Sequence, residues 1–241
     1  FYKKTFDLKK SKKQLDLLKY PIIIKDACGS NSKGIFVSIP DSKIAIKIIE
    51  KELPVFKSMI AQEMVFGKEY RLLVLGNKVI GALEMILPSI VGDGKSTIRK
   101  LIIEKQNTTE KRTKFDKSFK QILKRQKVDL ETIIPKKKII FLKNSACLAE
   151  GGETRDVTDL VNKEVQKICI EASKVVGKNL VGIDVICKDI SNKPTSKSFH
   201  ILEINGMPDL YIHYNPTYGK SRNVVKDIVK FMAKLAIPSN I

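Results

Sequence analysis

The sequence is short of the side chains on which several classes of metal protein and enzyme depend. It has two histidines, His200 and His213, which are too few for a histidine-rich metal site. The four cysteines are scattered along the chain: Cys28, Cys147, Cys169 and Cys187. None forms a C-x-x-C pair, so a reduced cytoplasmic environment fits them better than a disulfide framework. No Ser-His-Asp or Cys-His set stands out, which argues against nucleophilic catalysis by a side chain.

Long apolar runs are also absent. No stretch approaches the length of a membrane span, and the start, Phe1-Tyr-Lys-Lys4, has neither an apolar signal core nor an initiator Met. We therefore expect a chain that starts at an interior cut, with no membrane partner. Its 241 residues, 43% of them hydrophobic, can form one large or two small globular domains.

Acidic residues are the minority among the charged ones. There are 26 Asp and Glu against 45 Lys and Arg, which gives a formal charge of +19. This charge favours anionic partners such as nucleotides, acidic peptides or nucleic acid. Because the lysines are spread out and no nucleic-acid-binding signature accompanies them, binding of nucleic acid is the less favoured interpretation.

Two apolar runs with acidic interruptions are the most informative part of the chain. Residues 181–187 and 199–205 are rich in β-branched residues and predict two strands. Side chains alternate along a strand, so Glu203 and Asn205 share a face, and Asp184 stands alone among apolar neighbours. A divalent cation, best Mg²⁺, would satisfy these three oxygen donors. The alternative is that these side chains cap loops or pair with lysines.

The rest of the chain alternates between helical and extended patterns. Helices are expected at residues 7–20, 41–53, 98–105, 165–176 and 223–235. Strands are expected at 21–25, 35–37, 59–65, 70–75, 78–85 and 138–142. Gly76-Asn77 joins two of these strands in a hairpin, and residues 138–142 are expected to return to the sheet. The class is therefore α+β.

Four segments carry weaker signals. Residues 26–34 are a small-residue loop between two strands, able to cover phosphates or to be an ordinary hairpin loop. The run 89–97 fails as a P-loop because position 89 is Ser, which leaves a glycine turn before a helix. Residues 105–138 predict a basic helical insert or lid, with anion binding as the minority interpretation. Residues 151–159 and 206–213 are expected to be loops, the first of them leading into a helix.

The order of these features is more specific than any one of them. It includes Lys25 and its loop, Gln62-Glu63, Glu69-Tyr-Arg71, V-G-D-G-K-S-T-I from 91, G-G-x-x-x-D-V-T-D from 151, and the pair G-I-D and E-I-N. Over roughly residues 20–235 this series resembles an ATP-grasp ligase, most nearly the module of the cyanophycin synthetases. The glutathione-forming bifunctional ligases and N-acetylglutaminylglutamine synthetase are similar as well.

The resemblance implies a fold and a reaction. The fold is ATP-grasp, with two α+β subdomains of mainly antiparallel sheets gripping ATP: a lid subdomain at 1–66 and a C-terminal subdomain at 67–241. The opening strand and helix of a whole module are missing: either they belong to a longer enzyme with an upstream domain, or the segment has been lost, which would put catalysis in doubt. A homo-oligomer is a further option for the partners. The reaction is ligation of a carboxylate to an amine of an amino acid or acidic peptide through an acyl phosphate. The alternatives are a glutathione- or dipeptide-type synthetase and a degenerate domain that binds without turnover.

The resemblance also implies roles for individual residues. Lys25 would contact the α and β phosphates, and Glu69 the ribose. The terminal phosphate would lie under a loop made of Gly29, Ser30, Asn31, Ser32, Lys33 and Gly34. The hinge beside adenine would be Gln62, Glu63, Met64 and Val65. Mg²⁺ would be held by Asp184, Glu203 and Asn205.

The side of the site that would face the other substrate is less well matched. Candidates for binding the acidic acceptor or stabilising the acyl phosphate are Lys95, Arg155 and His213, each against a structural or surface role. The sequence departs from the usual family residues at Asp26, Ser32, Cys147, Asp209 and Tyr211. Most of these departures are on the substrate side, so the resemblance predicts ATP and Mg²⁺ better than any particular amino acid.

Overall fold

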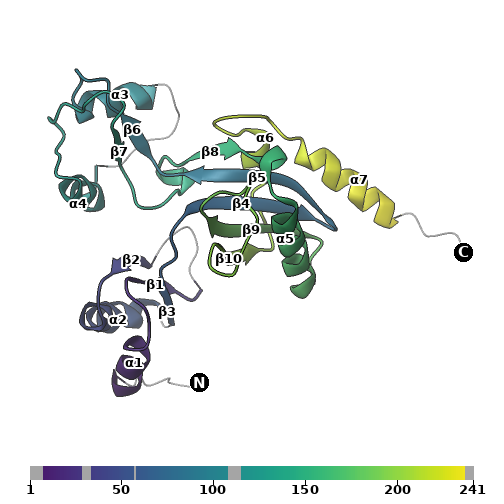
Figure 1. Ribbon diagram of the computed structural model, residues 1–241, viewed down its shortest axis with the longest axis horizontal. Helices are drawn as coiled ribbons and strands as arrows, with labels where there is room; N and C mark the ends of the chain where they lie inside the picture. Colours follow the sequence, from purple (N-terminus) through teal and green to yellow (C-terminus); the bar gives the residue numbers. More distant parts are fainter. Residues whose placement is uncertain (1–7, 29–33, 57, 108–114, 237–241) are drawn as a thin grey trace, which may run out of the picture. The chain divides into compact units, whose positions relative to one another are not determined.

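The computed structural model describes residues 8–28, 34–56, 58–107 and 115–236, which form two compact units. Unit 1 runs from Phe1 to Val65 and unit 2 from Phe66 to Ile241. The predicted loop residues 29–33 lie outside the described residues. Figure 1 labels the helices and strands of both units. Each unit is described by itself below.

Unit 1 is a three-stranded antiparallel sheet with two helices. Strand β1 (Ile22–Asp26) lies between β2 (Ile35–Ile39) and β3 (Met59–Glu63). Helices α1 (Leu8–Leu15) and α2 (Ser42–Phe56) contribute to its small core. Ile22 and Ile24 are fully buried, which follows from the alternation of the apolar run before Lys25. The backbone N–H of Ile44 donates to Asp41 Oδ1 at 2.9 Å, and this bond caps α2 at the acid predicted to begin it.

Unit 2 is built on a five-stranded antiparallel sheet. Its strands are β4 (Lys68–Leu75), β5 (Lys78–Ile86), β8 (Glu153–Asp156), β9 (Leu180–Cys187) and β10 (Phe199–Asn205), in the order β10-β9-β4-β5-β8. The predicted hairpin is confirmed, because Leu75 pairs with Lys78 across Gly76-Asn77. Both acidic strands are confirmed as well, and they are neighbours in the sheet.

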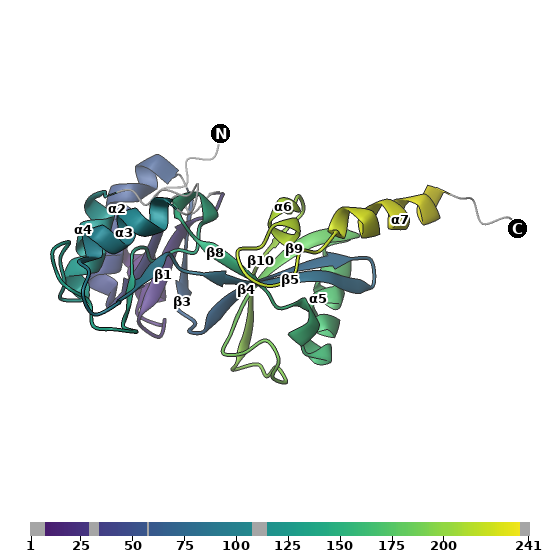
Figure 2. The ribbon, with the colours of Figure 1, turned by 90° about the horizontal axis from the view of Figure 1, so that it is seen from above.

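Two helices cover opposite faces of this sheet (Figure 2). Helix α5 (Lys163–Val175) packs on one face, where Leu72, Ile183 and Val185 are fully buried. The short α6 (Tyr211–Tyr214) packs on the other, where Ile212 joins a smaller core with Leu83 and Met85. Helix α7 (Val224–Ala236) ends the described part of the chain. The sheet therefore has one continuous apolar face and one face that leaves room for polar residues.

A separate lobe of unit 2 has its own core. It contains β6 (Ser89–Val91), β7 (Ile139–Phe141), α3 (Ile98–Asn107) and α4 (Lys117–Arg125), packed around Phe119 and other buried side chains. The prediction that residues 138–142 return to the main sheet was wrong. Strand β7 pairs with β6 in a two-stranded sheet, where Ile90 lies opposite Ile140. The basic insert is thus partly a packed lobe rather than wholly a solvated helix.

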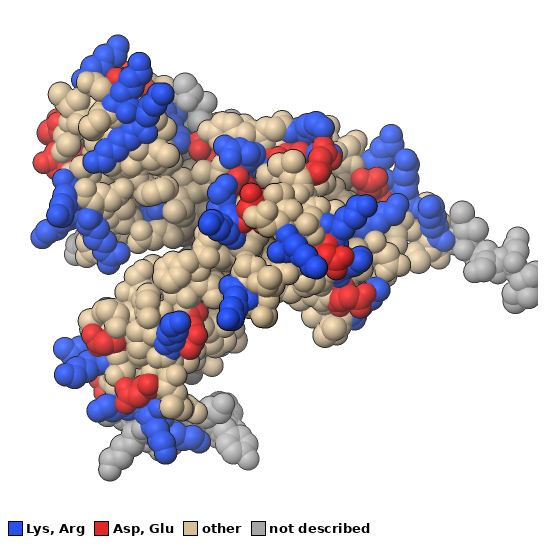
Figure 3. Space-filling model, in the orientation of Figure 1, with Lys and Arg blue, Asp and Glu red and all other residues tan. Residues whose placement is uncertain are grey.

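Two further expectations were wrong for local reasons. Residues 151–159 contain the edge strand β8, whose sequence Glu-Thr-Arg-Asp lacks the apolar alternation by which a strand is recognised. Residues 206–213 were expected to be loop throughout, whereas α6 begins at Tyr211. Lysines and arginines are spread over the surface drawn in Figure 3, as the sequence predicted. Within the described residues, no helix is long and apolar enough to cross a membrane.

Candidate functional site

The three predicted magnesium ligands lie together on β9 and β10. Glu203 is directly opposite Asp184, and Asn205 is opposite Gly182. The Asn205 amide donates to Glu203 Oε1 at 2.8 Å and to Asp184 Oδ2 at 3.3 Å. Opposed residues of antiparallel strands share a face, so the pairing brings all three side chains to one patch. The strand alternation predicted this convergence, and the structure has it.

A cation already neutralises part of this patch. Arg71 on β4 lies opposite Asp184 and donates to both of its carboxylate oxygens, Nε to Oδ1 at 2.6 Å and Nη2 to Oδ2 at 2.7 Å. Asp184 is only 4% exposed, so an unpaired charge there would be costly. The hydrogen bond with Asp184 raises the pKa of the Arg71 guanidinium further. Arg71 therefore holds the Asp184 carboxylate in position.

Glu69 belongs to the same patch. It is two residues from Arg71 on β4, so the two side chains share a face. Burial raises the pKa of the Glu69 carboxyl, the charges of Asp184 and Glu203 raise it further, and Arg71 opposes them. Three carboxylates and one guanidinium thus interact on one sheet face, with a net negative charge that a bound cation would offset.

The donor set fits a hard divalent cation. Among the described residues, no three His, Cys, Asp or Glu side chains are grouped to hold a metal ion. The predicted set instead combines the two carboxylates of Asp184 and Glu203 with the amide of Asn205. Magnesium is held in this way when phosphate oxygens and water complete its shell. The chemistry of the residues present is therefore compatible with Mg²⁺.

Arg155, predicted on the substrate side, is on the other face of the sheet. It is opposite Glu84, which is opposite Tyr70, and Tyr70 is buried in the core under α5. Its guanidinium pairs with Glu84 at 3.1 Å and lies 5.5 Å from the ring centre of Tyr218. The structure does not bring Arg155 together with the three predicted metal ligands.

His213 is on the same face as the acidic patch but is closed off. It is fully buried, and neither ring nitrogen has a hydrogen-bond partner among the described residues. Burial lowers the pKa of His213 to about 4, and the charge of Arg71 adds to the effect. A Cβ placed on Gly81 would lie 2.6 Å from His213 Nδ1, so the ring packs directly on β5. In this position His213 is a neutral packing residue.

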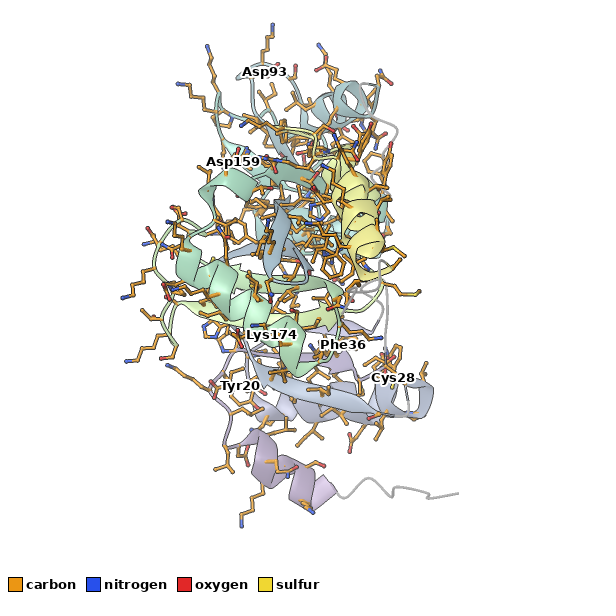
Figure 4. All side chains as sticks on the ribbon, turned by 90° about the vertical axis from the view of Figure 1, so that its right-hand side faces the viewer. Tyr20, Cys28, Phe36, Asp93, Asp159 and Lys174 are labelled. Carbon is orange, nitrogen blue, oxygen red and sulfur yellow. The ribbon has the colours of Figure 1, made fainter. Side chains whose placement is uncertain are left out.

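Lys95 is in the separate lobe, in the turn before α3. Asp93 accepts from the backbone N–H groups of Lys95 at 2.9 Å and of Ser96 at 2.7 Å, and also from the Ser96 hydroxyl. These bonds lower the pKa of Asp93 to about 2. Figure 4 labels Asp93 at the outer end of this lobe, away from Asp159 after β8. The V-G-D-G-K-S-T run thus forms a hydrogen-bonded turn that presents Lys95 to solvent.

The nucleotide residues predicted in unit 1 lie along its sheet. Lys25 is half-buried near the end of β1, between Ile35 and Ile60 of the neighbouring strands. Gly34 has φ +69°, a conformation that glycine adopts without strain. The loop positions Gly29, Ser30, Asn31, Ser32 and Lys33 lie outside the described residues.

The predicted hinge begins at the end of β3. Gln62 and Glu63 are exposed, and Glu63 Oε1 accepts from the backbone N–H of Lys19 at 2.9 Å. Met64 donates its backbone N–H to Pro21 O at 3.1 Å, and Val65 is the last residue of unit 1. The roles predicted for Lys25, for this hinge and for Glu69 stay predictions.

Sequence reasoning missed two features of unit 2. Arg71 was named only as part of the Glu69-Tyr-Arg71 run and was given no role, although its spacing of two residues from Glu69 is the signal that puts it in the patch. A cavity of about 440 Å³, lined by parts of α3, β8 and α6, was not foreseen at all. Its walls are distant in the chain, so no local pattern points to it.

Comparisons with known proteins agree with the sequence resemblance. No protein-family model matches the chain. It is 30% identical over 234 residues to a cyanophycin synthetase of Synechocystis sp.. That match covers 92% of this chain and 27% of the synthetase. It is 26% identical over 243 residues to the glutathione biosynthesis bifunctional protein GshAB of Clostridium perfringens, covering 95% of this chain and 30% of that one. The chain thus spans between a quarter and a third of these relatives.

Solved structures share the fold. A bifunctional glutathione synthetase from Pasteurella multocida aligns with a TM-score of 0.68 and 22% identity, over 95% of this chain and 34% of that one. The ATP-grasp ligase PsnB, solved with a phosphomimetic variant of a minimal precursor, Mg and ADP, aligns with a TM-score of 0.53 and 13% identity. That match covers 95% of this chain and 51% of PsnB. The chain therefore has the ATP-grasp fold and is a relative of one section of the cyanophycin synthetases and the bifunctional glutathione-forming ligases.

Proposed function

We propose that this chain is the ATP-grasp section of an ATP-dependent ligase that joins a carboxylate to an amine, in the cytoplasm. The observation that carries the proposal is the convergence of Asp184, Glu203 and Asn205 on one face of the sheet, beside Arg71. The named relatives that match 92% or more of the chain support it. Because the chain spans only part of those proteins, the substrates of the whole protein are part of the proposal.

The residues of this patch suit phosphoryl transfer to a carboxylate. In the proposed reaction, a carboxylate oxygen attacks the γ-phosphorus of ATP, ADP leaves, and the product is an acyl phosphate. The amine then attacks the acyl carbon, phosphate leaves, and the nitrogen loses a proton to give the amide. Both steps depend on positioning and on neutralising phosphate charge, so no nucleophilic side chain is required.

Each residue of the patch has a distinct part in this proposal. Asp184, Glu203 and Asn205 would hold Mg²⁺, which would neutralise phosphate charge when bound. Arg71 fixes the orientation of the Asp184 carboxylate through two hydrogen bonds. We assign Lys25 to the nucleotide phosphates and Glu69 to the ribose, as the resemblance implies.

The test is release of phosphate from ATP in the presence of Mg²⁺ and a panel of carboxylate and amine substrates, with the product identified by mass spectrometry. We expect substrate-dependent release that Glu203→Ala abolishes. Glu171→Ala is the control, since Glu171 is an exposed acid on α5 that pairs with Lys174 on the same helix. Nucleotide binding with no phosphate release under any substrate mixture would overturn the ligase and favour a binding module.

A further inference from the structure

The cavity of about 440 Å³ in unit 2 is a built pocket with an apolar floor. Three of the residues that line it are almost fully buried: Ile102 and Leu142 are 1% exposed and Ile212 is 5% exposed. Its volume falls within the range of small-molecule sites, which are mostly apolar with a few placed polar groups. The floor therefore suits an aliphatic or aromatic group of the size of an amino-acid side chain.

Two of the charged residues that line the cavity form an ion pair. Lys105 Nζ pairs with Glu153 Oε1 at 2.8 Å and donates to Ser89 O at 2.7 Å. The Tyr218 hydroxyl donates to the other oxygen of Glu153 at 3.3 Å. Glu153 is 7% exposed, so its buried carboxylate needs the partners that this network supplies.

Asp209 is the remaining charged residue among the described residues that line the cavity, and it is exposed. Its Oδ1 accepts from the backbone N–H of Tyr211 at 2.9 Å. Its Oδ2 has no donor among the described residues. With Lys105 and Glu153 paired, the described residues of the lining carry one net negative charge, that of Asp209, although the whole chain has a formal charge of +19. A ligand with a positively charged group is the electrostatic match.

The cavity is on the face of the sheet that carries the acidic patch. Thr154, which lines it, is opposite Met85, and Met85 is opposite Glu69. These three residues share a face and are on consecutive strands. Two strand spacings put Thr154 about 10 Å from Glu69. A molecule in the cavity is therefore next to the groups that we assign to the nucleotide.

We propose that this cavity binds the amine substrate, an amino acid or peptide end with a cationic amino group and an apolar body, and that Asp209 is the partner of the ammonium group. This inference rests on the proposed ligase function. It differs from the anionic partners that the net charge of the sequence favours, because the described lining of the cavity has a charge opposite to that of the chain.

Three probes share a leucine side chain and differ in charge, so comparing their affinities separates the effect of charge from that of shape. L-leucinamide has an ammonium group and no carboxylate, N-acetyl-L-leucine has a carboxylate and no amine, and N-acetyl-L-leucinamide is uncharged. Binding of each to the full chain is measured by calorimetry without ATP. We expect leucinamide to bind about fivefold more tightly than the uncharged probe, and N-acetyl-leucine to bind most weakly. The preference should shrink as salt is added.

Two variants locate the binding. Asp209→Asn removes the charge and keeps an acceptor for Tyr211, so it should abolish the preference for leucinamide and leave the uncharged probe unchanged. Asp189→Asn is the matched control, because exposed Asp189 also accepts from the backbone N–H two residues ahead, that of Ser191. Asn215→Trp at the exposed rim narrows the cavity and should weaken all three probes.

Each outcome of these binding measurements either supports the proposal or overturns it. A preference for leucinamide that is lost in Asp209→Asn and kept in Asp189→Asn supports the proposal. Equal affinities, a preference for N-acetyl-leucine, no binding of any probe, or a preference unaffected by Asp209→Asn overturns it. Because no nucleotide is present, a failed cavity assignment is distinguishable from a failed ligase assignment, which the phosphate-release assay tests separately.

Discussion

Arg71 and Asp184 form a two-point ion pair across neighbouring strands, 113 positions apart in the sequence, with donor–acceptor distances of 2.6 and 2.7 Å. The pair is on the sheet face that carries the candidate metal ligands. Asp184 is almost completely buried, and the side chain of Arg71 is 23% exposed. Such a pair contributes to stability chiefly because removing one partner leaves the other charge buried and uncompensated.

Arg71→Met should therefore destabilise unit 2 by about 3 kcal/mol in urea unfolding. Arg71→Lys should cost less, because an ammonium keeps the charge but cannot make both hydrogen bonds in one plane. Arg99→Met is the control: Arg99 also contacts its partner Glu131 at 2.6 Å, but both side chains are at least half exposed. That change should cost less than about 1 kcal/mol. Equal losses for the two methionine variants would show that burial of the Arg71 pair is not what matters.

Glu69 offers a test of the metal site that does not depend on activity. The pKa of its carboxyl is raised by burial and, next, by the charge of Asp184. A cation held by Asp184 and Glu203 would cancel part of that repulsion, so adding Mg²⁺ should lower the pKa of Glu69. The measurement is a carboxyl-carbon NMR titration with and without Mg²⁺. In Asp184→Asn and Glu203→Gln, adding Mg²⁺ should no longer lower the pKa of Glu69. If Mg²⁺ instead binds elsewhere on the chain, it would change the pKa of Glu69 equally in the parent chain and in both variants.

The sequence predicts most of this patch because its information is local. Alternation along residues 199–205 puts Glu203 and Asn205 on one face, and spacing puts Arg71 beside Glu69. What the sequence does not contain is strand order. Placing Arg71 next to Asp184 requires that β4 and β9 be neighbours in the sheet. The two residues are 113 positions apart in the sequence, so no local pattern specifies this pairing.

The wrong predictions have the same origin. Strand β7 was recognised as a strand, but its partner is β6 rather than the main sheet, and nothing in an apolar run specifies its partner. Strand β8 was missed because it is a short, polar edge strand, stabilised by pairing with β5 rather than by its own composition. The cavity depends on both of these segments, which is why its lining could not be derived from the chain alone.

His213 makes stability depend on pH in a direction set by its burial. Its pKa is lowered to about 4 from the ordinary 6.5, so between these values the unfolded chain binds a proton that the folded chain does not. Stability is therefore complete above pH 6.5 and falls as the pH drops toward 4, by about 3 kcal/mol from this group. Urea unfolding from pH 4.5 to 7.5 measures the slope.

His213→Leu should flatten that slope, and His213→Gln, which keeps polarity without titrating, should flatten it too. His200→Gln removes the other histidine, on β10, outside this contact with Gly81. A slope retained in both His213 variants would mean that carboxylates, not this histidine, govern the acid sensitivity of unit 2.

Variants of Gly92 and Lys95 test whether the V-G-D-G-K-S-T run is a structural turn or an anion-binding site. A Cβ on Gly92 would be 2.2 Å from Pro135 O and 2.4 Å from Ile134 Cγ2, a contact that only movement of the backbone could relieve. Gly92→Ala should therefore cost about 1 to 3 kcal/mol in urea unfolding, the cost of overpacking. Gly206→Ala is the control, because the nearest atom there is Lys178 Cε at 4.0 Å.

If the run also binds a substrate anion, Lys95→Ala should reduce ligase activity without affecting stability, since Lys95 is exposed. Loss of stability in Gly92→Ala together with full activity in Lys95→Ala would show that Gly92 is needed to pack this turn against Ile134 and Pro135, and that the lysine predicted to be catalytic has no part in the reaction.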